Sequence, residues 1–199
     1  DQDEVYNIID TAESGAGLTA HQMAYHEKNK VRDCAILMLF LGTGIRISEL
    51  VGLNNEDINF ENNSFIVTRK GGNKSILYFD SDVAAALLRY MEYKENQPLS
   101  REDPNALFLS SKNRRITVRA VENLVQKYAK IVSPLKKISP HKLRSTYGTQ
   151  LYKATGDIYI VADILGHKDV NTTRKHYAAI SDDNRRSVVG KVKLTKTDE

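Results

Sequence analysis

The sequence contains a single cysteine, Cys34, so no internal disulfide can form. Such a cysteine content is typical of a reducing cytoplasm, and we expect Cys34 itself to be a small buried apolar residue. The longest apolar run, residues 34–41, is much shorter than the roughly 20 residues that a membrane-spanning helix needs. No basic and apolar leader opens the chain. We therefore expect a cytoplasmic protein without a membrane partner.

Charge of one sign is not in large excess either. The 199 residues include 29 Lys and Arg and 25 Asp and Glu, for a net charge of +4, which permits a polyanionic partner without requiring one. The 41% hydrophobic content is enough to bury a core. No repeat, low-complexity tract or long interior linker divides the chain, so residues 1–199 are expected to form one domain. Because the sequence begins at Asp1, directly with a helical pattern, we expect a fragment of a longer parent protein.

Apolar residues at helical spacing predict helices in the N-terminal part of the chain. The first helix covers residues 5–12, and after a break at residues 14–17, Thr19 can cap a short helix beginning at Ala20. The apolar run at residues 34–41 is too long for a typical strand and ends at a glycine-rich turn. It predicts a buried core helix.

The pattern changes between residues 57 and 79. Two β-rich runs, 65–68 and 76–79, flank Gly71-Gly72-Asn73, which is typical of a hairpin. Helical spacing then returns in segments separated by proline- and glycine-containing breaks, at residues 81–95, 118–132, 140–155 and, more briefly, 158–165. The expected fold class is therefore mostly α (α+β), with one small antiparallel sheet.

The segment Ser139-Pro140-His141-Lys142-Leu143-Arg144 is a candidate anion site. Ser139 is a good N-cap and Pro140 suits the first helical position, so His141 and Arg144 would lie on one face of the first turn. Free backbone N–H groups and the positive end of the helix dipole point the same way. A phosphate there would meet several donors. The alternative for His141 and Arg144 is a solvated surface pair, and this motif alone does not decide between the two.

Arg46 is a second candidate, because it follows a glycine-broken turn and arginine grips phosphate with two parallel hydrogen bonds. Glu49, three residues on, can orient its guanidinium. Lys70 is a third candidate, since a hairpin tip can carry an ammonium into a groove. Taken singly, Arg46 and Glu49 also match a surface ion pair. Lys70 also matches an ordinary loop lysine, and Arg69 and Lys74 compete for its role.

The last candidate segment runs from His167 to Tyr177. His167 follows a glycine at a predicted helix end. Asn171-Thr172-Thr173 favours capping of a new helix, which can fold Tyr177 back toward His167. Ten tyrosines occur in the chain, so residue type alone does not distinguish Tyr177 from a packed amphipathic residue. The adjacent His176 points in a different direction on a helix, and we do not expect it to be catalytic.

In this order the motifs resemble those of the tyrosine recombinase (phage integrase) family. The matching pieces are TGIRISEL with Arg46, RKGGNK with Lys70, HKLR with His141 and Arg144, LGH with His167, and HYA with Tyr177. Each piece is weak, but the ordered set is specific. The resemblance implies a helical catalytic domain with an antiparallel sheet of about three strands and a core at residues 1–180. It also implies an N-terminal core-binding domain in the parent protein.

The resemblance implies a site-specific recombinase or integrase that cleaves and rejoins DNA. Tyr177 would attack a phosphodiester in line, forming a 3′-phosphotyrosyl bond and releasing a 5′-hydroxyl, and another 5′-hydroxyl would later reverse the step. Because the bond energy is kept, no nucleotide cofactor is implied. Because the leaving oxygen would be protonated and the phosphate clamped, no metal cofactor is implied either. The implied roles are charge stabilisation for Arg46, Arg144 and His167, general base for His141, and general acid for Lys70.

The expected partner is double-stranded DNA, bound by a homotetramer that can be monomeric without DNA. Candidate contacts to the DNA backbone are Lys112, Arg114, Arg115 and Arg119. By resemblance, the tail at residues 181–199 packs on a neighbouring protomer, and packing within its own chain is the alternative. The segment at residues 14–30 is longer than we expect in this family ahead of the Arg46 helix, and we assign it no function.

Three other functions compete with this one. A type IB topoisomerase shares the tyrosine chemistry but relaxes DNA without exchanging strands, and the HKLR and LGH motifs favour the recombinase. A catalytically silent DNA-binding module leaves the complete set of six residues unexplained. A helical interaction protein predicts no salt-dependent attraction to DNA. Among recombinases, phage integration, movement of a conjugative element and resolution of chromosome dimers all stay open.

Overall fold

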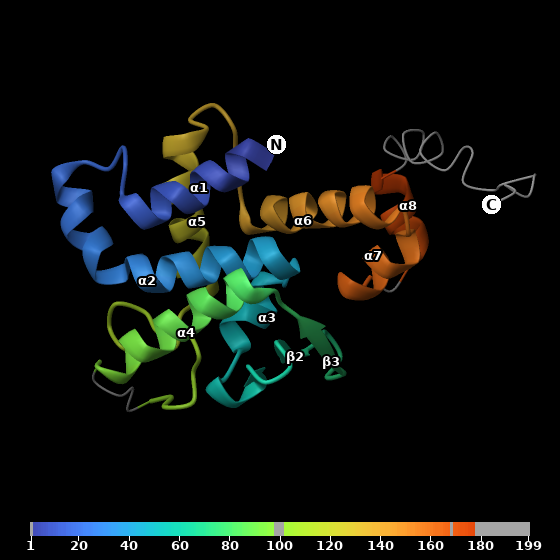
Figure 1. Ribbon diagram of the computed structural model, residues 1–199, viewed down its shortest axis with the longest axis horizontal. Coiled ribbons are helices and arrows are strands. Elements are labelled where there is room, and N and C mark those ends of the chain that lie inside the picture. Colours follow the sequence, from blue (N-terminus) through green and yellow to red (C-terminus); the bar gives the residue numbers. More distant parts are fainter. Residues whose placement is uncertain (1, 98–101, 168, 178–199) are drawn as a thin grey trace, which may run out of the picture. The chain divides into compact units, whose positions relative to one another are not determined.

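The computed structural model describes residues 2–97, 102–167 and 169–177 (Figure 1). The chain divides into two compact units, Asp1–Tyr147 and Gly148–Glu199, with the boundary inside helix α6, Pro140–Thr155. The predicted tail at residues 181–199 lies outside the described residues. The predicted fold class is confirmed, because helices predominate and one small antiparallel sheet interrupts them.

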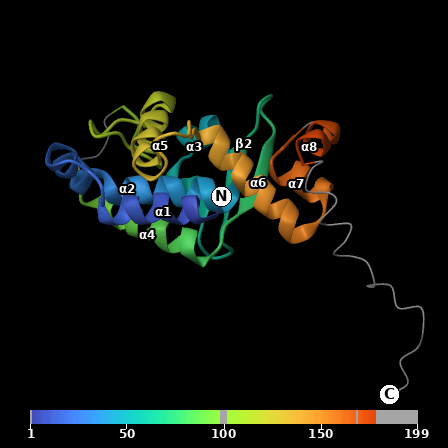
Figure 2. The same cartoon turned by 90° about the horizontal axis from the view of Figure 1, so that it is seen from above.

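The first unit is built around helix α2, Ala20–Thr43. This helix packs against α1, Gln2–Ser14, and α4, Ser81–Glu95, while α1 also packs against α5, Val118–Val132. Figure 2 shows α1, α2 and α4 side by side. The apolar run at residues 34–41 supplies several fully buried side chains to this core, as the sequence predicted.

Helix α2 corrects one expectation. It begins at Ala20, and Thr19 caps it through a reciprocal pair of hydrogen bonds with Gln22, but it continues without interruption for 24 residues. The prediction of a short helix was wrong because polar residues interrupt the apolar pattern between residues 26 and 33. Several of these polar side chains are nevertheless buried, where they bond to one another and to neighbouring elements.

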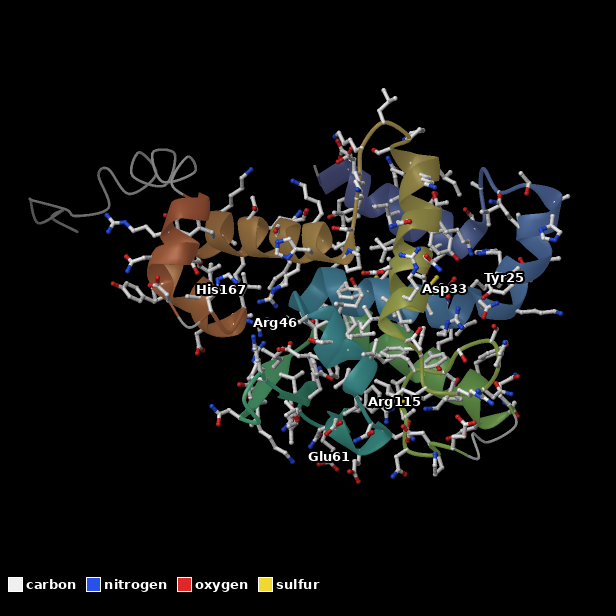
Figure 3. All side chains as sticks on the ribbon, turned by 180° about the vertical axis from the view of Figure 1, so that it is seen from behind. Tyr25, Asp33, Arg46, Glu61, Arg115 and His167 are labelled. Atoms are coloured by element: carbon white, nitrogen blue, oxygen red, sulfur yellow. The ribbon has the colours of Figure 1, made fainter. Side chains whose placement is uncertain are left out.

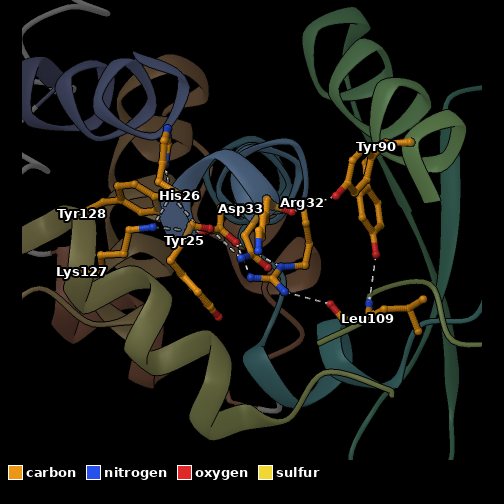
Figure 4. A network of polar contacts seen from close by, with 11 residues as sticks. Tyr25, His26, Arg32, Asp33, Tyr90, Leu109, Lys127 and Tyr128 are labelled. Carbon is orange, nitrogen blue, oxygen red and sulfur yellow. Dashed lines mark hydrogen bonds and ion pairs between the residues drawn. The ribbon is translucent and has the colours of Figure 1, made fainter. Parts of the chain in front are cut away.

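These buried polar groups form a network centred on the Asp33 carboxylate (Figure 4). Its Oδ1 accepts from Arg32 Nη2 at 2.6 Å, and its Oδ2 accepts from the Tyr128 hydroxyl at 2.9 Å. His26 Nδ1 lies 3.1 Å from the same hydroxyl. Burial, with the adjacent Asp33 charge, raises the pKa of Tyr128, so the phenol remains a donor. The network thus joins α2 to α5 without leaving Asp33 unpaired.

The sheet follows helix α3, Ile47–Gly52, and a 3₁₀ turn at Asn55–Asp57. Within the described residues its strands are β1, Ile58–Asn59, β2, Ser64–Thr68, and β3, Lys74–Tyr78. They lie in the order β1-β2-β3, with antiparallel neighbours. The sheet therefore has the predicted size.

The β2–β3 hairpin has the alternation expected of a sheet with one buried face. Phe65 and Val67 are buried, whereas Ile66 between them is exposed and pairs with the exposed Ile76. The hairpin predicted around Gly71-Gly72-Asn73 is confirmed, and its tip projects beyond the paired strands.

The second unit comprises the end of α6, helix α7, Ile158–Ile164, and helix α8, Val170–Tyr177, with α7 packed against α8. Gly156, at a φ of +68°, turns the chain after α6, and the Asp157 carboxylate caps α7. Within the described ranges of both units, no helix combines the length and apolar character needed to cross a bilayer.

Candidate functional site

Arg46 stands where the chain leaves α2 and enters α3 (Figure 3). Gly44 ends α2 in the left-handed conformation, at a φ of +62°, and its N–H donates to the Phe40 carbonyl at 3.0 Å. Ile45 is then fully buried, which anchors the turn. The Thr43-Gly44 sequence thereby fixes the backbone on which Arg46 stands.

Glu49 holds Arg46 at two points. Its Oε2 accepts from the Arg46 backbone N–H at 3.1 Å, as an N3 carboxylate does in a capping box, and its Oε1 accepts from Arg46 Nη1 at 2.7 Å. The Glu49 side chain is only 3% exposed, whereas Arg46 is half-buried. A desolvated carboxylate thus orients a guanidinium that still reaches solvent.

Arg144 is fixed on the same turn as Arg46. Its Nη1 donates to the Gly44 carbonyl, although the two residues lie 100 positions apart in the sequence. Ser139 starts α6 by accepting from the Lys142 N–H at 3.4 Å, which places Arg144 in the first two turns. Arg144 is 7% exposed, so it is not the solvated surface residue of the alternative interpretation, whereas His141 is exposed.

Lys70 is exposed at the tip of the β2–β3 hairpin. Gly71 and Gly72 shape the tip with φ values of +102° and +86°, which favour glycine. The side chain of the preceding residue is held instead, because Arg69 Nη1 contacts Glu49 Oε1 at 3.1 Å and Oε2 at 3.2 Å. Sequence reasoning named Arg69 only as a competitor of Lys70. Nothing local could reveal a partner 20 residues away.

His167 is positioned by the C-terminal end of α7. Gly166, at a φ of +57°, donates its N–H to the Asp163 carbonyl, and the His167 N–H reaches back to the Ala162 carbonyl, both at 2.8 Å. This pair of bonds is a Schellman motif, which requires glycine or a similarly permissive residue at the left-handed position. The Leu165-Gly166-His167 sequence therefore fixes where the imidazole leaves the backbone.

Thr173 is the partner of His167 that sequence reasoning missed. Its fully buried hydroxyl lies 2.6 Å from His167 Nδ1. The capping role expected for Asn171-Thr172-Thr173 was wrong, because α8 begins at Val170 and Asp169 Oδ1 caps it by accepting from the Asn171 N–H at 2.8 Å. Thr173 thus lies within the first turns of α8 and faces inward. Tyr177 ends the helix, and its side chain lies outside the described part of the structure, as does that of His176.

The four predicted DNA contacts differ in their surroundings. Arg115 donates to the Val51 and Leu53 carbonyls at 3.0 and 2.9 Å and is also paired with Asp103 (Figure 3). Its guanidinium therefore tethers the loop before α5 to the end of α3. Lys112, Arg114 and Arg119 are exposed, and the two arginines are paired with Glu102 and Glu122 respectively.

The first unit thus brings Arg46, Arg144 and Glu49 together. Lys70 directly follows Arg69, which also bonds to Glu49. Guanidinium groups at the end of a helix suit a phosphate, which accepts several charge-assisted hydrogen bonds. His167 and Tyr177 belong to the second unit. Among the described residues, no group of three or more His, Cys, Asp or Glu side chains is arranged to hold a metal ion.

Comparison with known proteins gives matches of the same kind in sequence and in structure. Residues 1–184 match the model of the phage integrase family. Tyrosine recombinase XerC of Thermodesulfovibrio yellowstonii is 36% identical over 146 residues, which cover 72% of this chain and 48% of the relative. The chain therefore spans about half the length of that curated relative.

Two solved structures share the fold. The crystal structure of XerA recombinase superposes with a TM-score of 0.76 at 24% identity, covering 98% of this chain and 65% of the other. The Tn1549 transposon integrase, solved in complex with circular intermediate DNA, gives a TM-score of 0.62 at 27% identity, with 85% and 63% covered. In each case the matched part of this chain includes residues of both units.

Proposed function

Because the chain belongs to the phage integrase family, we propose that it is the catalytic domain of a site-specific tyrosine recombinase acting on double-stranded DNA. The observation that carries the proposal is the attachment of Arg46 and Arg144 to one turn, through Glu49 and the Gly44 carbonyl. Two preorganised guanidiniums from distant parts of the sequence suit a single phosphodiester. The parent protein is proposed to add an N-terminal core-binding domain.

The proposed reaction first requires that charge be stabilised. In-line attack makes phosphorus five-coordinate, and its non-bridging oxygens gather negative charge. We assign Arg46, Arg144 and His167 to those oxygens, since donors fixed in advance need no reorganisation when the charge develops, and each can contribute about 3 kcal/mol. Glu49 offsets part of the positive charge while keeping Arg46 oriented.

Proton transfer is assigned to the more exposed groups. A phenol with its ordinary pKa of about 10 is a poor nucleophile at neutral pH, so His141 is proposed to take the proton of Tyr177 as its oxygen bonds to phosphorus. The bond from phosphorus to the 5′-oxygen then breaks, and Lys70 is proposed to protonate that oxygen. The exposed positions of His141 and Lys70 leave both accessible to a bound duplex.

Strand exchange also requires several active sites on one DNA assembly, and a homotetramer is proposed for it. Attraction to DNA would come from exposed cations, with Lys112, Arg114 and Arg119 as candidates. The internal contacts of Arg115 argue for a structural role instead.

The test uses a suicide duplex that carries the crossover site and a nick just 3′ of the scissile phosphate. Cleavage releases a short 5′-hydroxyl fragment, which diffuses away and leaves the protein linked to DNA. The expected result is a DNA-linked band on denaturing electrophoresis that is absent with Tyr177→Phe. Binding of DNA without such a band by the unmodified chain would instead support a silent DNA-binding module.

A further inference from the structure

We propose that Arg69 is a positioning residue that sets the position of Lys70 by tying the start of the β2–β3 hairpin tip to the carboxylate that orients Arg46. The inference rests on the proposed function, because it takes Lys70 to be the general acid. It assigns to Arg69 a role that neither its residue type nor its position in the RKGGNK motif reveals.

The side chain of Arg69 is held on one side of the hairpin. Its Nη1 lies 3.1 and 3.2 Å from the two oxygens of Glu49, and the side chains of Arg69 and Glu49 are only 11% and 3% exposed. Ion pairs so shielded from water are screened less than surface pairs and hold their geometry more strictly. Glu49 therefore joins two guanidiniums, one from the N-cap of α3 and one from the hairpin.

The backbone of Arg69 closes the hairpin tip. Its N–H donates to the Asn73 carbonyl at 2.7 Å, and its carbonyl accepts from the Gly72 N–H at 3.0 Å. Side chain and backbone of one residue thus connect the tip to Glu49. Because Lys70 follows directly, the position of its Cα depends on this connection.

The tip itself offers little other support. A Cβ built on Gly71 or Gly72 would meet no atom within 4 Å, so these residues stand in open space. Two glycines with positive φ also allow the tip to adopt other shapes. The tip therefore takes its direction from the point where it leaves β2, at which Arg69 is bound to Glu49.

Arg69 is not itself suited to act as the acid. A guanidinium does not release a proton in proteins, whereas an ammonium can. Arg69 and Lys70 therefore have different proposed roles. Lys70 would donate the proton, and Arg69 would set its distance from the 5′-oxygen. Displacing a catalytic group by about 1 Å can slow a reaction by about 100-fold.

The experiment compares the suicide duplex with one in which sulfur replaces the bridging 5′-oxygen of the scissile phosphate. A thiol has a pKa of about 8.5, against about 15.7 for water as a model of a hydroxyl. Sulfur therefore leaves as a thiolate without receiving a proton. Loss of the acid should slow cleavage of the oxygen substrate and spare the sulfur substrate.

Arg69→Gln should cleave the oxygen substrate about 10- to 100-fold more slowly than the unmodified protein and restore most of that loss with sulfur. Lys70→Ala should behave in the same way, while Arg46→Ala should be slow with both, because charge stabilisation is needed with either leaving group. Lys74→Gln, at the far side of the tip, removes the same charge from an exposed side chain. Weaker attraction to DNA would affect both substrates equally in that control.

The ratio of oxygen to sulfur rates does not depend on how much of a variant is folded, so a destabilised Arg69→Gln remains informative. An Arg69→Gln that is equally slow with both substrates, while Lys70→Ala is rescued by sulfur, would overturn the inference and leave the proposed function standing. Normal cleavage of the oxygen substrate by Arg69→Gln would overturn it too. Failure of sulfur to rescue Lys70→Ala would contradict the role of Lys70 in the proposed function.

Discussion

Thr173 Oγ1 lies 2.6 Å from His167 Nδ1, and this contact holds the imidazole in addition to its backbone anchor. Gly166 sets where His167 leaves α7, while Thr173 comes from α8, the helix that ends at Tyr177. The two groups that the second unit contributes to the proposed chemistry are therefore linked through a single helix. A hydrogen bond to one ring nitrogen selects the tautomer and so determines what the other nitrogen can do.

Replacing Thr173 by valine keeps the shape of the buried side chain and removes only the hydroxyl. The imidazole loses this hydrogen bond, and we expect DNA cleavage to slow by about tenfold, corresponding to one hydrogen bond of about 1.4 kcal/mol. Cleavage rates on the suicide duplex measure the effect. Thr155→Val is the matched control, since it removes an exposed hydroxyl that donates to the Leu151 carbonyl at 2.8 Å and accepts from the Asp157 N–H at 3.2 Å. Equal rates for Thr173→Val and the unmodified protein would contradict a role of the Thr173 hydroxyl in positioning His167.

Arg114 and Arg115 are neighbours with opposite expected phenotypes. Arg115→Ala removes the Arg115 donor from the Val51 carbonyl, one of the two donors to the Leu53 carbonyl and the ion-pair partner of Asp103, so we expect the free energy of unfolding to fall by about 2 to 3 kcal/mol. Arg114→Ala removes an exposed ion pair with Glu102 and should change it by less than about 0.5 kcal/mol. Urea unfolding checks both values.

For DNA binding we expect the reverse: Arg114→Ala should have the larger effect and Arg115→Ala the smaller one. If Arg114 contacts a phosphate, Arg114→Ala should weaken binding and reduce the slope of log affinity against log salt by about 0.9. A folded Arg115→Ala protein should keep the slope of the unmodified chain. A reduced slope for Arg115→Ala alone would reverse the assignment.

Glu4 gives the first unit a predictable response to acid. Hydrogen bonds from Lys136, at 2.5 Å, and Ser133, at 2.7 Å, lower the pKa of Glu4 from 4.5 to about 2. Because the folded pKa is lower than the unfolded one, the stabilisation is complete above about pH 4.5 and is lost as the pH falls toward 2. Glu4→Gln should therefore be less stable than the unmodified protein at pH 6, by an amount that shrinks in acid.

Urea unfolding at a series of pH values measures that difference. The matched control is Glu13→Gln, whose ion pair with Arg89 spans 3.7 Å between exposed side chains. It should stay within about 0.5 kcal/mol of the unmodified protein at each pH. A Glu4→Gln difference that is constant from pH 6 to pH 3 would contradict the contribution of the Glu4 charge.

Local signals in the sequence were sufficient for most of the fold. The helix at Val118–Val132 and the hairpin around Gly71 were predicted because caps, periodicity and turn residues act over a few positions. The length of α2 was missed, since its polar residues near Asp33 are stabilised by α5, a helix more than 80 residues away in the chain. Periodicity cannot reveal a partner of that kind.

The same contrast between local signals and long-range contacts applies to the candidate site. The glycine turns before Arg46 and His167 are local, and the sequence signals both. The side-chain partners Arg69 and Thr173 were not identified, because one reaches Glu49 across 20 residues and the other was interpreted as a helix cap. Supporting contacts of this type carry no motif of their own. Only the folded chain identifies them.

Locating the covalent bond between protein and DNA tests the proposed role of Tyr177 most directly. The protein is trapped on the suicide duplex, digested with a protease and a nuclease, and the nucleotide-bearing peptide is sequenced by mass spectrometry. The expected product is a phosphotyrosyl adduct on Tyr177, linked to the 3′ end of the cleaved strand. An adduct on another residue, or cleaved DNA with no adduct on the protein, would contradict it.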